Sequence, residues 1–245
     1  YKRPTIERRI ERRMVLHKLE RLDDYLAYVQ ANAAELSLLY SDLLIGVTGF
    51  FRDQEYFDAL KSIVFPRMID DRNPELPIRI WVAGCATGEE AYSLAISILE
   101  YLGERVSNYR VQIFATDIEE HSLARARLAV YPQNIEPDIS PERLRRFFSR
   151  TDKGYQVHRA VRDMVTFARH NLAKDPPFSR IDLVTCRNVM IYLQAALQKR
   201  VLRHFHYSLN AHGFLFLGTS ESVGDGSDLF SLIDRKAKIY TKKDS

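Results

Sequence analysis

One stretch of the chain, residues 78–93, constrains the fold more than any other. The apolar run Ile-Arg-Ile-Trp-Val-Ala ends at Gly84, and a helical pattern begins after Gly88, with apolar side chains recurring every four residues up to Leu102. This order predicts a strand, a tight turn and a helix start, which together open a nucleotide-type βα unit. The two glycines allow the backbone to approach a ligand that a Cβ atom would keep away.

Two glutamates, Glu89 and Glu90, follow this turn directly. A dinucleotide would place its pyrophosphate on the free N–H groups of such a helix start. Carboxylates there complement the helix dipole themselves and repel a phosphate. The pattern therefore favours a nucleoside without phosphates and with a cationic end, such as S-adenosylmethionine, over a nicotinamide dinucleotide. We assign Glu89 to the methionine end of this cofactor.

A second apolar strand, Val111–Ala115, leads to Asp117 at about the spacing of a βαβ crossover. A carboxylate at that strand end can accept hydrogen bonds from both hydroxyls of a ribose. Alternatively, Asp117 caps the helix expected around His121 to Leu128, and the two roles need not exclude each other.

The rest of the chain alternates between predicted strands and helices. Helical patterns run from Thr5 to about Ser62, and Arg67–Pro77 is typical of a polar connector. Further elements are expected as helices at Ala91–Leu102, Ser122–Leu128 and Ala195–Leu209, and as strands at Met164–Phe167, Ile181–Cys186 and Phe214–Gly218. This order predicts an α/β fold with a doubly wound, mostly parallel sheet whose ligands bind at its carboxyl edge.

We divide the chain into an N-terminal all-α domain with a linker helix, residues 1–66, and a catalytic domain, residues 67–245. A small antiparallel β insert is expected at about 140–170, because alternating apolar residues flank the turn Asp152-Lys153-Gly154. The turn is compact, so we expect two strands with a short connection.

Composition limits the class of protein. Of the 245 residues, 46% are hydrophobic and 28% charged, as in soluble globular proteins. No apolar run approaches the ~20 residues of a membrane span, and no secretory segment is evident. Cys85 and Cys186 both end strands, which favours buried packing over a disulfide or a nucleophile, and a reducing compartment, the cytoplasm. Because the chain opens at Tyr1, we expect a fragment of a longer protein.

The N-terminus is basic. Residues 1–21 carry eight Lys and Arg residues against three Glu, among them Arg9, Arg12 and Arg13. These arginines form either a solvated face or a docking surface for an acidic partner. Anionic membrane and nucleic acid are alternatives, and nucleic acid ranks last because no aromatic residues interleave the patch.

No metal is expected, since His204 and His206 face different directions on one predicted helix.

Six motifs in order resemble the chemotaxis receptor methyltransferase family, often called CheR. They are Val47–Asp53, Ala86–Ser93, Ala115–Ile118, Asn171-Leu172, Cys186–Tyr192 and Gly218–Glu221, and the resemblance covers nearly all 245 residues. The resemblance implies methyl transfer from S-adenosylmethionine to glutamate side chains of chemoreceptors, with S-adenosylhomocysteine as the product.

The resemblance also implies roles for single residues. Thr48 and Arg52 would cover the cofactor, whereas composition alone would make Arg52 a surface residue. The family often has asparagine two positions before this threonine, where this chain has Gly46. Assigned to cofactor binding by position and resemblance are Thr48, Arg52, Gly84, Glu89, Asp117, Asn171, Leu172, Arg187 and Asn188. Tyr192 either lines the methyl channel or packs half-buried.

Methyl transfer to a glutamate needs no strong general base, because the carboxylate is already ionised near neutral pH. We expect Arg52 and Tyr192 to take the catalytic roles of orienting the substrate and shaping the channel. The expected partner is the cytoplasmic helices of chemoreceptors, engaged without the C-terminal pentapeptide tether that some family members bind at a longer, Gly-rich loop. Alternatives are a methyltransferase for a small molecule or RNA, and a non-catalytic S-adenosylmethionine-binding regulator.

Overall fold

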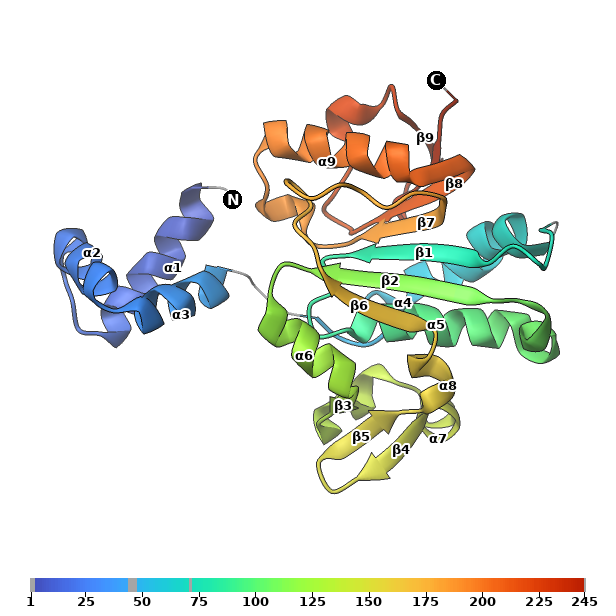
Figure 1. The fold of residues 1–245 in the computed structure, drawn as a ribbon, viewed down its shortest axis with the longest axis horizontal. Helices are drawn as coiled ribbons and strands as arrows, with labels where there is room; N and C mark the ends of the chain where they lie inside the picture. Colours follow the sequence, from blue (N-terminus) through green and yellow to red (C-terminus); the bar gives the residue numbers. More distant parts are fainter. Residues whose placement is uncertain (1–2, 44–47, 71, 245) are drawn as a thin grey trace.

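A seven-stranded sheet forms the centre of the structure, in the order β6-β2-β1-β7-β8-β10-β9 (Figure 1). The computed structural model describes residues 3–43, 48–70 and 72–244. The strands are β1 Ile78–Ala83, β2 Val111–Asp117, β6 Val165–Arg169, β7 Ile181–Cys186, β8 Leu209–Leu217, β9 Phe230–Asp234 and β10 Ile239–Lys242. The pairs from β6 to β8 are parallel, and β10 is antiparallel to both β8 and β9. The predicted mostly parallel α/β sheet is confirmed.

Helices precede the sheet and connect its strands. They are α1 Arg3–Leu16, α2 Leu22–Ala31, α3 Ala33–Leu43, α4 Gln54–Ala59, α5 Glu89–Leu102, α6 Glu120–Leu128, α7 Pro141–Phe147, α8 Arg159–Arg162 and α9 Ala195–Ser208, with π-helical turns at Leu60–Val64 and Pro66–Asp70 and 3-10 turns at Gly103–Asn108, Gln133–Asp138, Met190–Tyr192 and Gly224–Gly226. The predicted helices α5, α6 and α9 are confirmed to within two residues at either end. The prediction of a connector from residue 67 was wrong, because Met68 and Ile69 are buried and hold further helical turns as far as Asp70.

Alternate residues of β1 pack on opposite faces of the sheet. Ile80 and Val82 join the apolar cluster that includes residues of α5, and Trp81 joins the cluster that includes residues of α9. The indole Nε1 of Trp81 donates to Thr116 Oγ1 (2.9 Å), and its ring lies against His170 and Phe178. Both faces of the central strands are therefore covered, which fixes the register of the strand ends.

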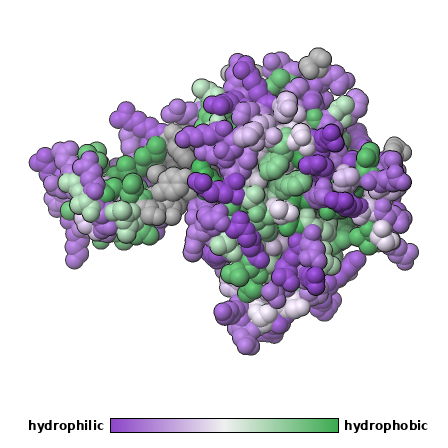
Figure 2. Space-filling model, viewed as in Figure 1, coloured by the Kyte–Doolittle hydropathy of each residue, from purple (hydrophilic) through white to green (hydrophobic). Residues whose placement is uncertain are grey.

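The first three helices form what we call the N-terminal lobe, residues 3–43, which lies apart from the sheet in Figure 1. Helices α1 and α2 both pack on α3. Large apolar side chains remain at least half exposed on the lobe: Val15, Leu16, Leu22, Leu26, Leu36 and Leu38. Figure 2 shows hydrophobic and hydrophilic residues interspersed over the surface of the lobe. Nowhere in the described ranges is a helix both long and apolar enough to span a bilayer.

The small antiparallel sheet has three strands rather than the two expected. Its order is β3-β5-β4, with β3 Val130–Tyr131, β4 Phe148–Thr151 and β5 Gly154–Val157. The third strand was missed because Val130 directly follows α6, outside the predicted insert. Residues 165–169, placed within the insert by its predicted bounds, instead form β6 of the main sheet beside β2.

Candidate functional site

A cavity of about 300 Å³ lies at the carboxyl ends of β1, β2 and β7. The strand order reverses between β1 and β7, and such a switch point is where doubly wound sheets bind ligands. The lining includes Thr48, Arg52, Gly84, Cys85, Ala86, Glu90, Asp117, Glu119, Ser122, His170, Asn171, Leu172, Arg187, Asn188, Val189, Tyr192, Leu193 and Leu197. The cavity thus brings together every residue predicted for cofactor binding or catalysis except Glu89.

The turn after β1 forms one wall of the cavity and is fixed to the end of β2. Gly84 and Cys85 both donate their N–H to the carbonyl of Thr116, at 2.8 and 2.9 Å. Gly84 has φ +78°, and a Cβ there would lie 2.4 Å from Val189 Cγ2. Both the left-handed backbone and the close approach of Val189 therefore require glycine at this position.

The Asp117 carboxylate lies half-buried at the end of β2. Its Oδ2 accepts the Ala86 N–H (2.8 Å) and its Oδ1 accepts the Glu119 N–H (3.0 Å). Burial raises the pKa of Asp117. A carboxylate has about four lone-pair sites, so about two remain to face the cavity. The helix-capping role belongs instead to Glu119, which accepts the N–H groups of His121 and Ser122 at 3.0 and 2.6 Å.

The two glutamates after the turn point to different places. The Glu89 carboxylate is buried outside the cavity lining and accepts the Thr87 hydroxyl at 2.9 and 2.7 Å. Glu90 lines the cavity, and its Oε1 accepts the Thr185 hydroxyl at 2.6 Å. Burial raises the pKa of Glu90, and Arg187 opposes this rise. The glutamate that lines the cavity is therefore Glu90, whereas Glu89, the one assigned to the cofactor from the sequence, lies outside the lining.

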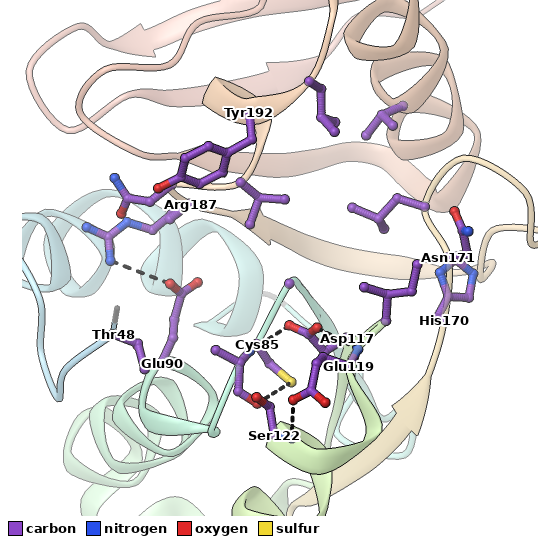
Figure 3. Close-up of a pocket in the computed structure, with 18 of the residues that line it drawn as sticks. Thr48, Cys85, Glu90, Asp117, Glu119, Ser122, His170, Asn171, Arg187 and Tyr192 are labelled. Atoms are coloured by element: carbon purple, nitrogen blue, oxygen red, sulfur yellow. Dashed lines mark hydrogen bonds and ion pairs between the residues drawn. The ribbon is translucent and has the colours of Figure 1, made fainter. Parts of the chain in front are cut away.

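Arg187 lies beside Glu90 on the side of the cavity opposite His170 and Asn171 (Figure 3), with Nη1 3.7 Å from Glu90 Oε2. Its side chain is 1% exposed, and its guanidinium lies over the rings of Phe216 and Phe57.

Through Nη2, Arg187 donates to Asp53 Oδ2 (2.8 Å) and to the carbonyl of Arg52 (3.0 Å). These bonds hold the segment that carries Arg52 beside the sheet. The Nε and Nη1 atoms of Arg187 are buried and make no hydrogen bond to other described residues.

Residues from two loops complete the cavity. Asn171 Oδ1 accepts the Ala173 N–H (2.9 Å), and the Asn171 N–H donates to Asp175 (2.7 Å), so this loop is internally braced. Leu172 belongs to the apolar side, and Tyr192 also lines the cavity. Gly46, where the family often has asparagine, lies outside the described residues.

Both cysteines are buried, as predicted, and burial raises the pKa of both thiols. Within the described ranges, no three His, Cys, Asp or Glu side chains gather as a metal site.

Comparison with known proteins identifies the family. The family model for the CheR methyltransferase SAM-binding domain matches residues 46–239, and the model for the CheR all-alpha domain matches residues 1–44. The chain belongs to the CheR methyltransferase family. The two models meet near residue 45, whereas our division at residues 66 and 67 groups α4 with the lobe and stays a prediction.

Members of several bacterial groups are similar to this CheR-family chain. A chemotaxis protein methyltransferase of Listeria monocytogenes is 32% identical over 93% of this chain and 85% of its own length, and chemotaxis protein methyltransferase 2 of Vibrio cholerae is 30% identical over 98% and 85%. An uncharacterised 104.1 kDa protein of Rhodobacter capsulatus is 39% identical over 98% of this chain, which spans 25% of that relative's length.

In the N-terminal lobe, not all of the three arginines predicted for docking are exposed. Arg13 is 9% exposed, and its guanidinium pairs with Glu35 through Nε (2.8 Å) and Nη2 (2.5 Å). Arg13 therefore serves the interior of the lobe, and its assignment to docking is corrected. The pairing was not predictable from spacing, because Glu35 lies on another helix. Arg12 is exposed and Arg9 is half-buried.

Three further polar residues of the cavity lining were missed: Glu119, Ser122 and His170. Position after a strand was a usable signal for His170, which follows β6 directly. Glu119 and Ser122 reach the cavity because α6 begins immediately beyond Asp117, a detail that depends on the exact helix start.

Proposed function

We propose that this protein transfers a methyl group from S-adenosylmethionine to glutamate carboxylates of chemoreceptors, forming methyl esters. The observation that carries the proposal is the combination, in one cavity, of a ribose-competent Asp117 and the facing pair Glu90 and Arg187. Family membership supports the reaction class, and the printed names of relatives support chemotaxis as its setting.

The residues present fit the cofactor. Asp117 would accept both ribose hydroxyls with its remaining lone pairs, and Leu172 and Asn171 would flank the adenine. Glu90 offers negative charge to the cationic methionine end. The buried Nε and Nη1 of Arg187, which make no hydrogen bond to other described residues, suit the carboxylate of that same end, because a buried donor without a hydrogen bond is costly.

The chain's own residues would act by positioning. S-adenosylmethionine, when bound, supplies a methyl group on a positively charged sulfur. The acceptor carboxylate is ionised near neutral pH, so a general base is not needed. We propose that Arg52, exposed at the cavity, orients the acceptor and that Tyr192 and Thr48 restrict water around it. Arg52 must orient without tight pairing, because tight pairing would reduce the nucleophilicity of the carboxylate.

Radiolabelled methyl transfer tests this function. The protein is incubated with labelled S-adenosylmethionine and receptor cytoplasmic fragments, and the labelled fragment is treated with mild base. We expect label that base releases as methanol, as a methyl ester requires. Label stable to base would indicate another acceptor chemistry. Tight S-adenosylhomocysteine binding without transfer to any receptor fragment would favour the non-catalytic regulator.

We also propose that receptor docking does not use a C-terminal pentapeptide tether. Only Asp152 and Lys153 connect β4 to β5, and Gly154 (φ +123°) follows, where a Cβ would lie 2.1 Å from the Tyr131 carbonyl oxygen. This compact hairpin supports a tether-independent enzyme. We propose that the enzyme acts in the cytoplasm. We expect no pentapeptide binding by calorimetry and equal methylation of receptors with and without the tail. Micromolar affinity for the peptide would contradict the proposal.

A further inference from the structure

Glu221 binds more main-chain N–H groups than any other carboxylate described here, yet it does not line the cavity. It is 4% exposed and lies in the loop after β8. Its Oε1 accepts from Val189 (2.9 Å), Met190 (2.7 Å) and Ile191 (3.3 Å), and its Oε2 accepts from Asn188 (2.9 Å) and Gly218 (2.7 Å). One carboxylate thus joins the loops that follow two neighbouring parallel strands, β7 and β8.

The loop held in this way carries cavity residues. Arg187, Asn188 and Tyr192 all line the cavity, and four of the five N–H groups bound by Glu221 belong to residues 188–191, between Arg187 and Tyr192. Asn188 has φ +60°, a left-handed conformation that costs free energy in a residue other than glycine and persists where surrounding contacts enforce it. The Asn188 N–H is one of those that Glu221 binds, so the carboxylate stabilises the backbone at the strained residue.

The surroundings of Glu221 are shaped around its carboxylate. A Cβ at Gly218 would lie 2.6 Å from Glu221 Oε2 and 2.8 Å from the Asn188 N. Val189, whose N–H Glu221 also binds, packs against Gly84 of the turn after β1. The carboxylate therefore sets the distance between the Arg187–Tyr192 loop and the opposite wall of the cavity. A negative charge among several N–H groups also complements their dipoles, as an anion does at a helix start.

We infer that Glu221 is a positioning residue for methyl transfer: by accepting the N–H groups of Asn188 to Ile191, it holds Arg187, Asn188 and Tyr192 toward the cofactor. The inference rests on the proposed function of the cavity. Glutamine at this position has one acceptor oxygen, and its amide N–H groups would face main-chain N–H groups. Glu221→Gln should therefore release the loop while changing the side-chain volume little.

The test compares Glu221→Gln with Asp182→Asn. Asp182 is also buried and binds main chain, through the Arg79 N–H (2.9 Å), but it lies at the amino end of β7, away from the cavity. Both variants should lower the melting temperature. Only Glu221→Gln should raise the Kd for S-adenosylhomocysteine at least tenfold and raise KM for S-adenosylmethionine, with KM for the receptor fragment unchanged. Glu221→Asp, which keeps both oxygens, should recover part of the affinity.

Amide NMR of the unliganded protein supplies a second readout. The resonances of residues 188–191 and 218 should shift together in Glu221→Gln and remain in place in Asp182→Asn. A Glu221→Gln protein whose cofactor affinity and KM match those of Asp182→Asn would overturn the inference and leave the proposed function intact. A wild-type protein that fails to bind S-adenosylhomocysteine would overturn both.

Discussion

The N-terminal lobe and the sheet region bury different kinds of side chain. Among the described residues of the lobe, the buried side chains are Arg13, Tyr25 and Glu35, whereas those from residue 48 to 244 include dozens of apolar side chains on both faces of the sheet. Glu35 accepts from Arg13, from the Tyr25 hydroxyl (2.8 Å) and contacts His17 Nε2 (2.8 Å). The lobe is thus organised around a charge, and the sheet region around apolar packing.

The two regions of the chain should therefore differ in how their stability depends on pH. The stabilisation gained by burying apolar surface varies little with pH, whereas the stabilisation from a buried ion pair requires both partners to be ionised. Arg13 and the Tyr25 hydroxyl lower the pKa of Glu35 to about 2, against the opposing effect of burial. Mutation or protonation of Glu35 should therefore open the lobe and leave the sheet region folded.

The largest expected effect is that of Glu35→Ala. Removing one partner of a buried ion pair typically costs about 3–5 kcal/mol, because the other charge is left unpaired. We expect hydrogen exchange to show that residues 3–43 lose protection while the sheet strands keep theirs. Glu7→Ala is the matched control, because Glu7 pairs with Arg3 on the surface, where a pair contributes about 0–1 kcal/mol. Protection of the lobe that survives Glu35→Ala would remove the contrast between the two regions.

Acid should separate the regions by the same route. Because the pKa of Glu35 in the folded lobe lies below its ordinary value of 4.5, its stabilisation is present above pH 4.5 and is lost as the pH falls from 4.5 toward 2. Pulse-labelled hydrogen exchange across this range should show the lobe opening first. The Glu35→Gln variant should open without this pH dependence, and an unchanged dependence would assign it to other carboxylates.

The pKa values of the cavity carboxylates are shifted in the opposite direction to that of Glu35. Burial raises the pKa values of Asp117 and Glu90, so their ionised forms destabilise the empty cavity and are available to bind a ligand. Affinity for S-adenosylhomocysteine should fall on acidification at a higher pH than that at which the lobe opens.

Asp117→Ala should weaken the affinity for S-adenosylhomocysteine by about 1.5–3 kcal/mol, the usual value of hydrogen bonds to charged groups. Calorimetry on a folded variant with unchanged affinity would contradict the ribose assignment.

The smallest effect concerns receptor docking by the lobe. Arg8 and Arg12 are exposed one helical turn apart on α1, unlike the buried Arg13. Reversing both to glutamate should raise KM for the receptor a few-fold and flatten its salt dependence, because each exposed charge contributes only about 0.2–1 kcal/mol. Affinity for S-adenosylhomocysteine should not change. In the control, Lys199 and Arg203, which are exposed at the same spacing on α9, are changed to glutamate. An equal rise in KM for the control would show that the net charge of the protein, and not the α1 surface, causes the effect.

The pattern of apolar residues and glycines predicted those parts of the site that depend on residues close together in the sequence. The turn at Gly84 and the carboxylate of Asp117 were predictable, because a strand end and a helix start fix both positions. The choice between Glu89 and Glu90 was not, since it depends on how α5 leaves the left-handed Gly88. Arg13 and Glu221 were not predictable in their roles either, because each binds a segment remote in sequence. The strands β9 and β10 were missed because β10 pairs antiparallel with both β8 and β9, outside the βα alternation.

Trp81 is the single tryptophan of the chain, and its ring lies against His170, which lines the cavity. Its fluorescence is therefore a reporter of the sheet region alone. A denaturation curve followed by this emission would record the unfolding of the sheet region. It would not detect an earlier opening of the lobe, which contains no tryptophan. Far-ultraviolet circular dichroism, which detects the helices of both regions, would show the earlier loss. The separation between the two curves measures how independently the lobe and the sheet region unfold.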